Sequence, residues 1–293
     1  MKELEFKGPV TADGQIAIPA EDITRDVVTI WRYMDLPKFV SILATGRLWF
    51  AKASTLHDDP YEGFGKAARL TVPPGYDVPK LITQQMHNGA TRQISTRHWM
   101  ADTSDNAAGV IENAREHLYV NSWCLGEFES MAMWQIYGSL GSGVALKSSV
   151  GRYRRAAKLE VNSSQYAFGK VKYHDDLDSS PEIQRDFRSH IPVGSGLWSD
   201  VLQLGLHKRS CYKHENEWRA ALYQDPRPEI EGIPVIFDLD QLISGVYVGP
   251  RAEAYLGDVV ASIMDKFSLR KPLERSILLK SPRTEKATAA NGL

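Results

Sequence analysis

The pattern of apolar and polar residues predicts a strand, a helix and a second strand near the start of the chain. Residues 27–31 (VVTIW) are mostly β-branched or aromatic, as in a strand, and residues 48–51 (LWFA) have a similar character. Between them, four apolar residues recur at the spacing of one helix face: Leu36, Phe39, Val40 and Leu43. Asp35 precedes this face as a predicted N-cap, and Gly46 follows it as a predicted C-cap.

Further along, short apolar runs predict strands and longer periodic segments predict helices. Strands are expected at residues 118–124, 144–146, 167–173, 234–237 and 245–248. Helices are expected at residues 129–137 and 252–267, with a helical excursion over about 70–118 that is built on the patches 78–86 and 107–118. Because strands and helices do not alternate regularly, we expect an α+β fold, with a mixed, mostly antiparallel central sheet and flanking helices.

The same pattern divides the chain into three segments. A polar lead-in is expected at residues 1–26, a single α+β catalytic domain at residues 27–280 and a mobile tail at residues 281–293.

The charged run KRSCYKHENEWR, at residues 208–219, is the main candidate for chemistry. Its end predicts a strand, because a tryptophan leads into the apolar residues 220–223. Side chains alternate along a strand, which would place Glu215, Glu217 and Arg219 on one face. Burying ions is costly unless each finds a partner. The row is therefore either a paired structural network or a site for a polar substrate, and the spacing alone leaves both open.

Two further motifs offer polar groups. Arg32, at the end of the first predicted strand, can present a planar fork of donors to a phosphate or carboxylate, or pair with a structural acid. The loop HDDPYEG, at residues 57–63, carries Asp59 and Glu62, and acidic loops can bind hard cations. Its spacing does not fit an EF-hand, so a structural turn or a loop that faces a polar substrate is favoured over a metal site.

Aromatic and basic residues give weaker signals. Trp134 and Tyr137 lie one helical turn apart and can stack on a base, although such pairs more often belong to the core. The turn GSLGSG, at residues 138–143, matches neither a P-loop nor G-x-G-x-x-G. A small basic cluster, which can touch a phosphate backbone or form a solvated helix face, comprises Arg152, Arg154, Arg155 and Lys158.

Composition narrows the class of protein. The chain has 293 residues, of which 43% are hydrophobic, and its formal net charge of -1 gives no overall attraction to nucleic acid or anionic lipid. The sequence has no signal-peptide pattern and no apolar stretch of about 18 residues that could span a bilayer. Cys124 and Cys211 form no disulfide framework or zinc site. We expect a soluble cytoplasmic protein without a bound metal.

Several of these motifs occur together in one bacterial family. They are Trp31-Arg32-Tyr33, Asp58-Asp59-Pro60-Tyr61-Glu62, Ser130-x-x-Met133-Trp134-x-x-Tyr137, and Lys208 followed by Glu215-x-Glu217-Trp218-Arg219. In this order they resemble the bacterial family called domain of unknown function 2971, over about residues 28–270. Asp58 stands where that family often has Asn.

The opening strand–helix–strand, with an Arg on the first strand and a late Glu on another, also resembles the ADP-ribosyltransferase fold of toxins that modify DNA. This resemblance implies NAD as a substrate, with Arg32 on its phosphate side and Glu217, or Glu215, at the nicotinamide ribose as the catalytic acid. Ser54-Thr55 matches only part of that fold's Ser-Thr-Ser element. The residues expected to bind substrate or cofactor are Arg32, Tyr33, Asp59, Glu62, Trp134, Tyr137, Lys208 and Arg219.

We therefore expect an enzyme that acts at an N-glycosidic bond, in its most specific form an NAD-dependent ADP-ribosyltransferase in phage defence or toxin action. One alternative is a DNA glycosylase that removes a base, modified or unmodified, from phage DNA, with residues 152–158 on the DNA backbone. The other is a non-catalytic protein that binds a nucleotide or nucleic acid, in which the Glu–Arg row is structural.

Overall fold

The computed structural model describes residues 27–56, 59, 82–85, 91–94, 115–139, 141–158, 164–175, 202, 204–224 and 229–280. Nine strands form its central sheet: β1 (Thr29–Asp35), β2 (Arg47–Lys52), β5 (Leu118–Leu125), β6 (Gly143–Ser149), β7 (Ser164–Lys170), β10 (Glu217–Gln224), β11 (Gly232–Ile236), β12 (Gly245–Val248) and β13 (Leu273–Arg275). The helices are α1 (Leu36–Thr45), α4 (Met131–Tyr137), α5 (Val150–Ala156), α8 (Leu239–Leu242) and α9 (Leu256–Lys266), with short 3₁₀ turns η2 (Ala53–Thr55) and η3 (Ser210–Glu215).

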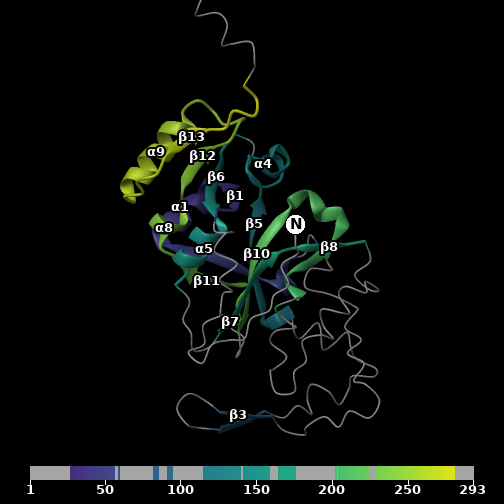
Figure 1. Ribbon diagram of the computed structural model, residues 1–293. Helices are drawn as coiled ribbons and strands as arrows, with labels where there is room; N and C mark the ends of the chain where they lie inside the picture. The colour runs from purple at the N-terminus through teal and green to yellow at the C-terminus, as the bar shows by residue number, and fades with distance from the viewer. Residues whose placement is uncertain are drawn as a thin grey trace, which may run out of the picture.

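The sheet branches at β5. Its main path runs β11-β2-β5-β1-β6-β12-β13, while β10 pairs with β5 and carries β7 on its far side (Figure 1). Within this central sheet every pairing is antiparallel except that of β12 with β13. The predicted α+β class, with a mostly antiparallel sheet and flanking helices, is thus confirmed.

The opening strand–helix–strand forms as the sequence predicts. The Asp35 side chain accepts a hydrogen bond from the Lys38 backbone N–H at 2.8 Å and caps α1. At the other end Gly46 has φ 64°, the left-handed conformation that glycine adopts without a steric penalty, and its N–H donates to the Ile42 carbonyl. The helix buries Phe39, with Ile42 and its neighbour Leu43, against the sheet.

The two faces of the sheet are covered differently. The face that carries Ile30, Trp123 and Trp218, which we call the helix face, packs with α1, α5, α8 and α9 into one large apolar cluster. The opposite face, which we call the network face, carries two smaller clusters. The α4 cluster comprises Trp31, Tyr33, Cys124, Met133, Trp134 and Ala145. The second cluster comprises Ala53, Leu118, Val120, Ala167, Leu202, Leu204, Ala221 and Tyr223.

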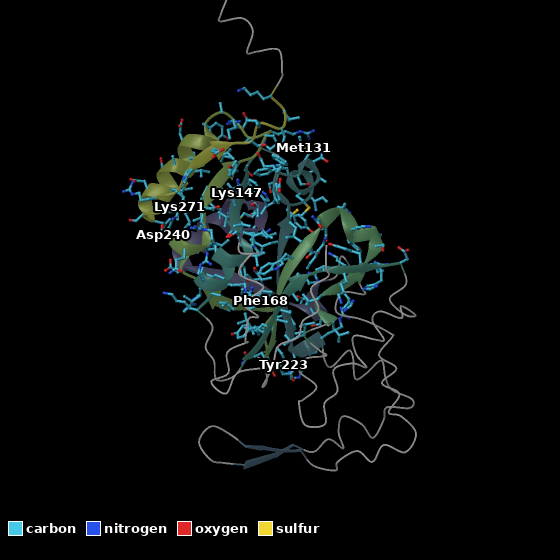
Figure 2. The ribbon with its side chains drawn as sticks, in the orientation of Figure 1. Met131, Lys147, Phe168, Tyr223, Asp240 and Lys271 are labelled. Carbon is cyan, nitrogen blue, oxygen red and sulfur yellow. The ribbon has the colours of Figure 1, made fainter. Side chains whose placement is uncertain are left out.

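These two clusters lie toward opposite ends of the sheet, as the labels on Met131 and Tyr223 show (Figure 2). The strand residues between them on the network face are Ser122 of β5 and, on β10, Glu217 and Arg219. A polar strip therefore separates two apolar clusters on that face.

β1 and β2 share one edge of β5. β10 follows β5 over seven residue pairs on its other edge. On the shared edge, β1 pairs with β5 at Ile30 and Trp31, and β2 pairs with a different part of β5 at Ala51 and Lys52. The sheet is thus forked where β1 and β2 separate. Side chains fill this fork: the Arg32 Nη1 atom donates to the Ser122 carbonyl at 2.9 Å, and the Asn121 amide donates to the Trp49 carbonyl at 2.8 Å.

Several predicted elements differ from the structure. The strand expected at residues 167–173 is two strands, because β7 ends at Lys170 and β8 (Lys172–His174) belongs to a separate two-stranded sheet. The helix expected at residues 78–86 is wrong at residues 82–85, where β3 (Ile82–Gln85) pairs antiparallel with β4 (Thr91–Ile94). The sequence between these strands contains Asn88-Gly89, a dipeptide typical of hairpin turns. The helix expected at residues 252–267 is shorter, since α9 begins at Leu256.

Other predictions stay open. The lead-in at residues 1–26 and the tail at residues 281–293 lie outside the described residues. Among the helices that the structure describes, none is long and apolar enough to cross a membrane.

Candidate functional site: a buried network of four ions

A residue with a left-handed backbone conformation brings the two acids of the charged run, Glu215 and Glu217, side by side. β10 begins at Glu217, so the predicted strand does not extend back to Glu215, which is the last residue of η3. Between them Asn216 has φ 42°, and its side-chain amide donates to the Leu125 carbonyl at 2.8 Å. Asn is among the few non-glycine residues that adopt this conformation readily. Glu215 thus lies beside Glu217 because of this turn and not because of strand alternation.

Four ions form one hydrogen-bonded network: Lys208, Glu215, Glu217 and Arg219. The Lys208 ammonium donates to Oε2 of Glu215 and, at 2.8 Å, to Oε1 of Glu217. Arg219 binds both oxygens of Glu217, with Nε at 2.6 Å and Nη2 at 3.0 Å, and its Nη1 donates to the Gly205 carbonyl. All four residues are at most 6% exposed. Two cations and two carboxylates balance when all are ionised.

A second, small sheet holds the network from the side. It pairs β8 (Lys172–His174) with β9 (His207–Arg209) in parallel, and Tyr173 lies opposite Lys208. The Tyr173 hydroxyl accepts a hydrogen bond from the Glu217 backbone N–H at 2.9 Å, and burial raises the pKa of that hydroxyl to about 12. Tyr173 is a site residue that the sequence did not indicate, because nothing in its local pattern distinguishes it from an ordinary strand residue.

The two carboxylates have opposite electrostatic environments. Burial raises the pKa of Glu215, and the hydrogen bond and negative charge of Glu217 raise it further than Lys208 lowers it. Burial alone would also raise the pKa of Glu217, but the Arg219 guanidinium and hydrogen bonds from Glu215 and Arg219 hold that pKa well below its usual range. Of the pair, Glu217 is therefore held in its charged form more strongly than Glu215.

Tyr137 connects this network to the surface. Its hydroxyl donates to Oε1 of Glu215 at 2.7 Å, while the residue as a whole is 44% exposed. It sits at the last position of α4, whose first turn is capped by the Ser130 hydroxyl. The Tyr33 hydroxyl accepts from the Ser130 backbone N–H and so holds the start of the same helix to β1. Tyr33 thus supports the network indirectly, by holding the helix α4 that carries Tyr137.

Trp134 lies in the α4 cluster and is only 4% exposed. Its indole N–H donates to Glu129 at 2.8 Å, and its ring meets Tyr33 edge-on with 5.0 Å between centroids. Trp134 is therefore a core residue of this structure, which leaves Tyr137 as the exposed aromatic ring of the predicted pair.

Arg32 does not join the acids. Its side chain lies on the helix face, beside the Trp123 ring at 5.9 Å, whereas Glu217 lies on the network face opposite Cys124. Burial lowers the pKa of the Arg32 guanidinium, which is engaged with the Ser122 carbonyl in the fork. The structure does not bring Arg32 and Glu217 together, because Trp31 is in register with Cys124 and Glu217 and the next residue, Arg32, points to the opposite face.

The acidic loop touches the site only at its edge. Asp59 is 3% exposed and pairs with Arg209, the residue after Lys208, at 2.9 Å. Glu62 lies outside the described residues. Within the part of the chain that the structure describes, no group of three or more His, Cys, Asp or Glu residues could hold a metal ion.

The predicted basic cluster is largely structural. Arg152 donates to the carbonyls of Asp240 and Ile243 at the end of α8, both at 3.1 Å. Arg154 lies over the Phe168 ring at 6.0 Å. Of the four, Arg155 and Lys158 are exposed to solvent, so the patch offers a nucleic-acid backbone less charge than the sequence suggests.

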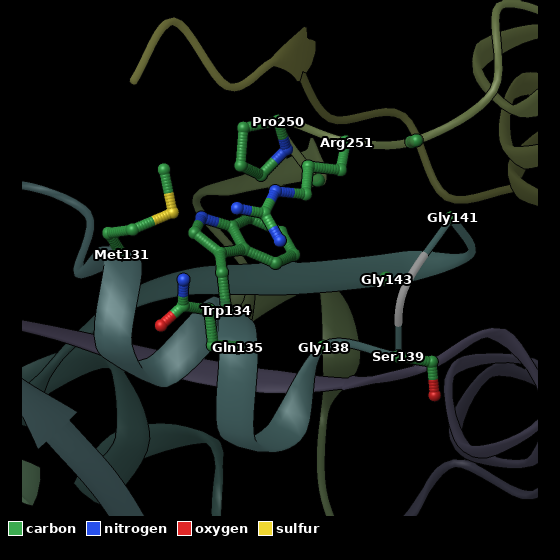
Figure 3. A pocket seen from close by; sticks show the side chains of 11 residues that line it. Met131, Trp134, Gln135, Gly138, Ser139, Gly141, Gly143, Pro250 and Arg251 are labelled. Carbon is green, nitrogen blue, oxygen red and sulfur yellow. The ribbon is translucent and has the colours of Figure 1, made fainter. Parts of the chain in front are cut away.

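A small pocket lies beside Trp134, and none of the four ions lines it (Figure 3). Met131 and Arg251 line it together with the glycine-rich turn after α4. Its volume of about 20 Å³ is room for roughly one water molecule. It is too small for a nucleotide, and we assign it no ligand.

Comparison with known proteins gives weak likenesses only. No family model and no curated protein matches the chain, so the resemblance to the domain of unknown function 2971 family is not confirmed. Among solved structures, the chain is similar to Thermus sp. 2.9 DarT in complex with NAD+ (TM-score 0.33, 11% identity, covering 85% of this chain and 95% of that one). It is also similar to Thermus sp. 2.9 DarT in complex with ADP-ribosylated ssDNA (TM-score 0.34, 11% identity, 85% and 94%). We therefore base the functional proposal on this chain's own residues.

Proposed function

We propose that this protein is an enzyme that acts at an N-glycosidic bond, most specifically an ADP-ribosyltransferase that uses NAD. The observation that carries the proposal is the buried pair of Glu215 and Glu217, of which Glu215 bonds to the hydroxyl of the partly exposed Tyr137. When an N-glycosidic bond breaks, positive charge develops at the anomeric carbon. A carboxylate fixed in a site of low dielectric stabilises that charge more strongly than water does.

A substrate would meet Glu215 beside Tyr137. In the described structure the Tyr137 hydroxyl donates to Oε1 of Glu215, so a ribose hydroxyl that binds this oxygen either shares it with Tyr137 or displaces Tyr137 from it. The exposed ring then stays beside the site, where it can stack on a planar group of the substrate.

The choice of NAD follows from the sequence resemblance to ADP-ribosyltransferases. Because Arg32 lies on the helix face, the proposal gives it no contact with the phosphates. The predicted role in phage defence or toxin action stays a prediction.

A DNA glycosylase is the second candidate, and the raised pKa of Glu215 favours it. A departing nucleic-acid base leaves more easily when a general acid protonates it, whereas nicotinamide leaves NAD as a neutral molecule without a proton. A Glu215 that holds its proton more strongly than an ordinary glutamate suits the first reaction.

One pair of assays separates the two candidates. The protein is incubated with NAD and with DNA, RNA and protein acceptors, and released nicotinamide is measured; in parallel, DNA alone is tested for abasic sites. The proposal predicts nicotinamide release that depends on Glu215 and Glu217. Abasic sites formed without NAD would support the glycosylase, and neither product under any condition would refute both.

A further inference from the structure

We infer that Glu215 is the residue that takes up and releases a proton in this site, that Glu217 is a permanently ionised anchor, and that Tyr137 positions Glu215 and links it to solvent. The chemistry of this inference rests on the proposed function. The assignment of the proton is a property of the free protein and can be measured without any substrate.

The hydrogen bonds that Glu217 accepts make its carboxylate a poor base. Three N–H donors from two cations hold its two oxygens, at 2.6, 2.8 and 3.0 Å. Arg219 binds both oxygens at once, and such bidentate pairs are geometrically rigid. A carboxylate held this way is stabilised in its charged form, so a proton is bound there only at great cost. Glu217 therefore sets the positions of Lys208 and Arg219 and keeps its negative charge throughout.

The bonds to Glu215 differ in kind. One of its oxygens accepts from Lys208, but the other accepts from the neutral hydroxyl of Tyr137. Among the residues that the structure describes, the cation bonded to Glu215 is Lys208, and it binds Oε2 rather than the Oε1 atom that accepts from Tyr137. Burial and the neighbouring Glu217 both favour the protonated form of Glu215. Of the two acids, Glu215 is therefore the one that takes up a proton at the higher pH.

Tyr137 lies between Glu215 and the surface of the protein. The hydroxyl touches Oε1 of Glu215, and the residue is 44% exposed, whereas Glu215 itself is 5% exposed. Burial and the charge of Glu215 raise the pKa of the Tyr137 hydroxyl, so it stays protonated and acts as a donor. Tyr137 is thus a positioning residue, and the group that reacts is Glu215.

In the transfer reaction these roles give a balanced step. The bond between the ribose C1′ and the nicotinamide nitrogen breaks, and its electron pair stays with nicotinamide, which becomes neutral. An electron pair of the acceptor forms the new bond to C1′, and the proton that the acceptor loses goes to Oε1 of Glu215. That proton then leaves to solvent past Tyr137.

The first test measures the proton directly. The protein is labelled with ¹³C at the glutamate side-chain carboxyls and titrated by NMR, and the signal that Glu215→Gln removes is assigned to Glu215. We expect Glu215 to titrate above the ordinary glutamate value of 4.5. We expect one glutamate carboxyl, that of Glu217, to stay ionised as far down in pH as the protein stays folded. Titration of Glu217 above Glu215 would overturn the assignment.

Tyr137→Phe provides a matched variant. It removes a donor to the charged form of Glu215, so the Glu215 pKa rises further while the Glu217 signal does not move. The control is Tyr255→Phe, a tyrosine that is 64% exposed at the start of α9. An unchanged Glu215 titration in Tyr137→Phe would contradict the positioning role.

The second test uses activity. In Glu215→Gln, transfer to the acceptor falls by about 100- to 10,000-fold, the usual worth of a general base, while cleavage of NAD falls less. Glu215→Asp restores part of the transfer. Equal losses of transfer and cleavage would overturn the role as a base. Wild type that cleaves no N-glycosidic bond, with Glu215 titrating as expected, would refute the proposed function and leave the proton assignment standing.

Discussion

At the residue scale, the two acids of the network are expected to differ in what they contribute to folding. Glu217→Gln leaves the Arg219 guanidinium, which is 1% exposed, without its bidentate partner. Breaking a buried pair in this way typically costs about 3–5 kcal/mol. Glu215→Gln costs less, because the amide oxygen can still accept from Lys208 or Tyr137. Urea unfolding of both variants checks this, and equal losses of stability would contradict it.

That comparison also decides between the two hypotheses that the spacing of the charged run left open. If Glu217 contributes mainly to stability and Glu215 mainly to activity, both hypotheses hold: the charged run is a structural network and also forms the substrate site. If both substitutions change stability alone, the row is structural and the protein is of the non-catalytic class.

Arg32 gives a second prediction at this scale. Replacing it with Leu leaves the Ser122 carbonyl of the fork without its donor, which costs about 1–3 kcal/mol when the group is buried. Because Arg32 lies on the helix face, the KM for NAD is expected to stay within the range of wild type. A large rise in KM in a folded Arg32→Leu protein would show that the guanidinium does meet the substrate.

At the element scale, the junction of η3 and β10 places the site. Asn216→Ala puts a less tolerant residue at φ 42° and removes the amide bond to Leu125, so we expect a loss of about 1–2 kcal/mol in unfolding free energy. Asn216→Gly keeps the backbone conformation and loses only the side-chain bond, so it is the milder change. Thermal unfolding compares the two, and an Ala variant more stable than the Gly variant would contradict the strain.

Helices and strands that carry cap residues or a clear apolar periodicity in their own sequence could be predicted, and very short elements could not. α1 carries its own cap residues and apolar spacing, and it forms where those place it. β13, with three residues, and α8, with four, are too short for a periodic pattern to show. The sequence places Glu215 beside Glu217 only if both belong to one continuous strand. In the structure a turn at Asn216 brings them together, and the charged residues around Asn216 do not predict that turn.

At the scale of the whole molecule, the two acids predict how stability depends on pH. The lowered pKa of Glu217 adds stability above the unfolded value of 4.5, and this is lost as the pH falls through its folded pKa. The raised pKa of Glu215 adds stability below 4.5, which is lost as the pH rises through its folded pKa. On acidification we therefore expect a gain from Glu215 first and a loss from Glu217 at lower pH.

Urea midpoints across the acid range measure this in wild type and in both Gln variants. The difference between wild type and Glu215→Gln should show the gain, and the difference from Glu217→Gln the loss. A Glu217 contribution that grows toward acid pH would contradict the assignment of its charge.

The long-range arrangement explains what the sequence could not show about the site. Which face of the sheet a side chain occupies depends on pairings such as β10 with β5, over 90 residues apart in the chain. Arg32 and Glu217 were both sound candidates as polar residues on strands, yet the pairing of β1 and β10 with β5 sends them to opposite faces. Lys208 and Tyr137, predicted from the same motifs, do meet the acids.

The most direct test of the central claim is the rate of ADP-ribosyl transfer from NAD, measured side by side for wild type and a folded Glu215→Gln protein with the same acceptors. We expect nicotinamide release and labelled acceptor with wild type, and a loss of labelled acceptor of about 100-fold or more in Glu215→Gln. Equal transfer by the two proteins, or no nicotinamide release by wild type with any acceptor, would contradict the claim that the buried acids form a site for this reaction.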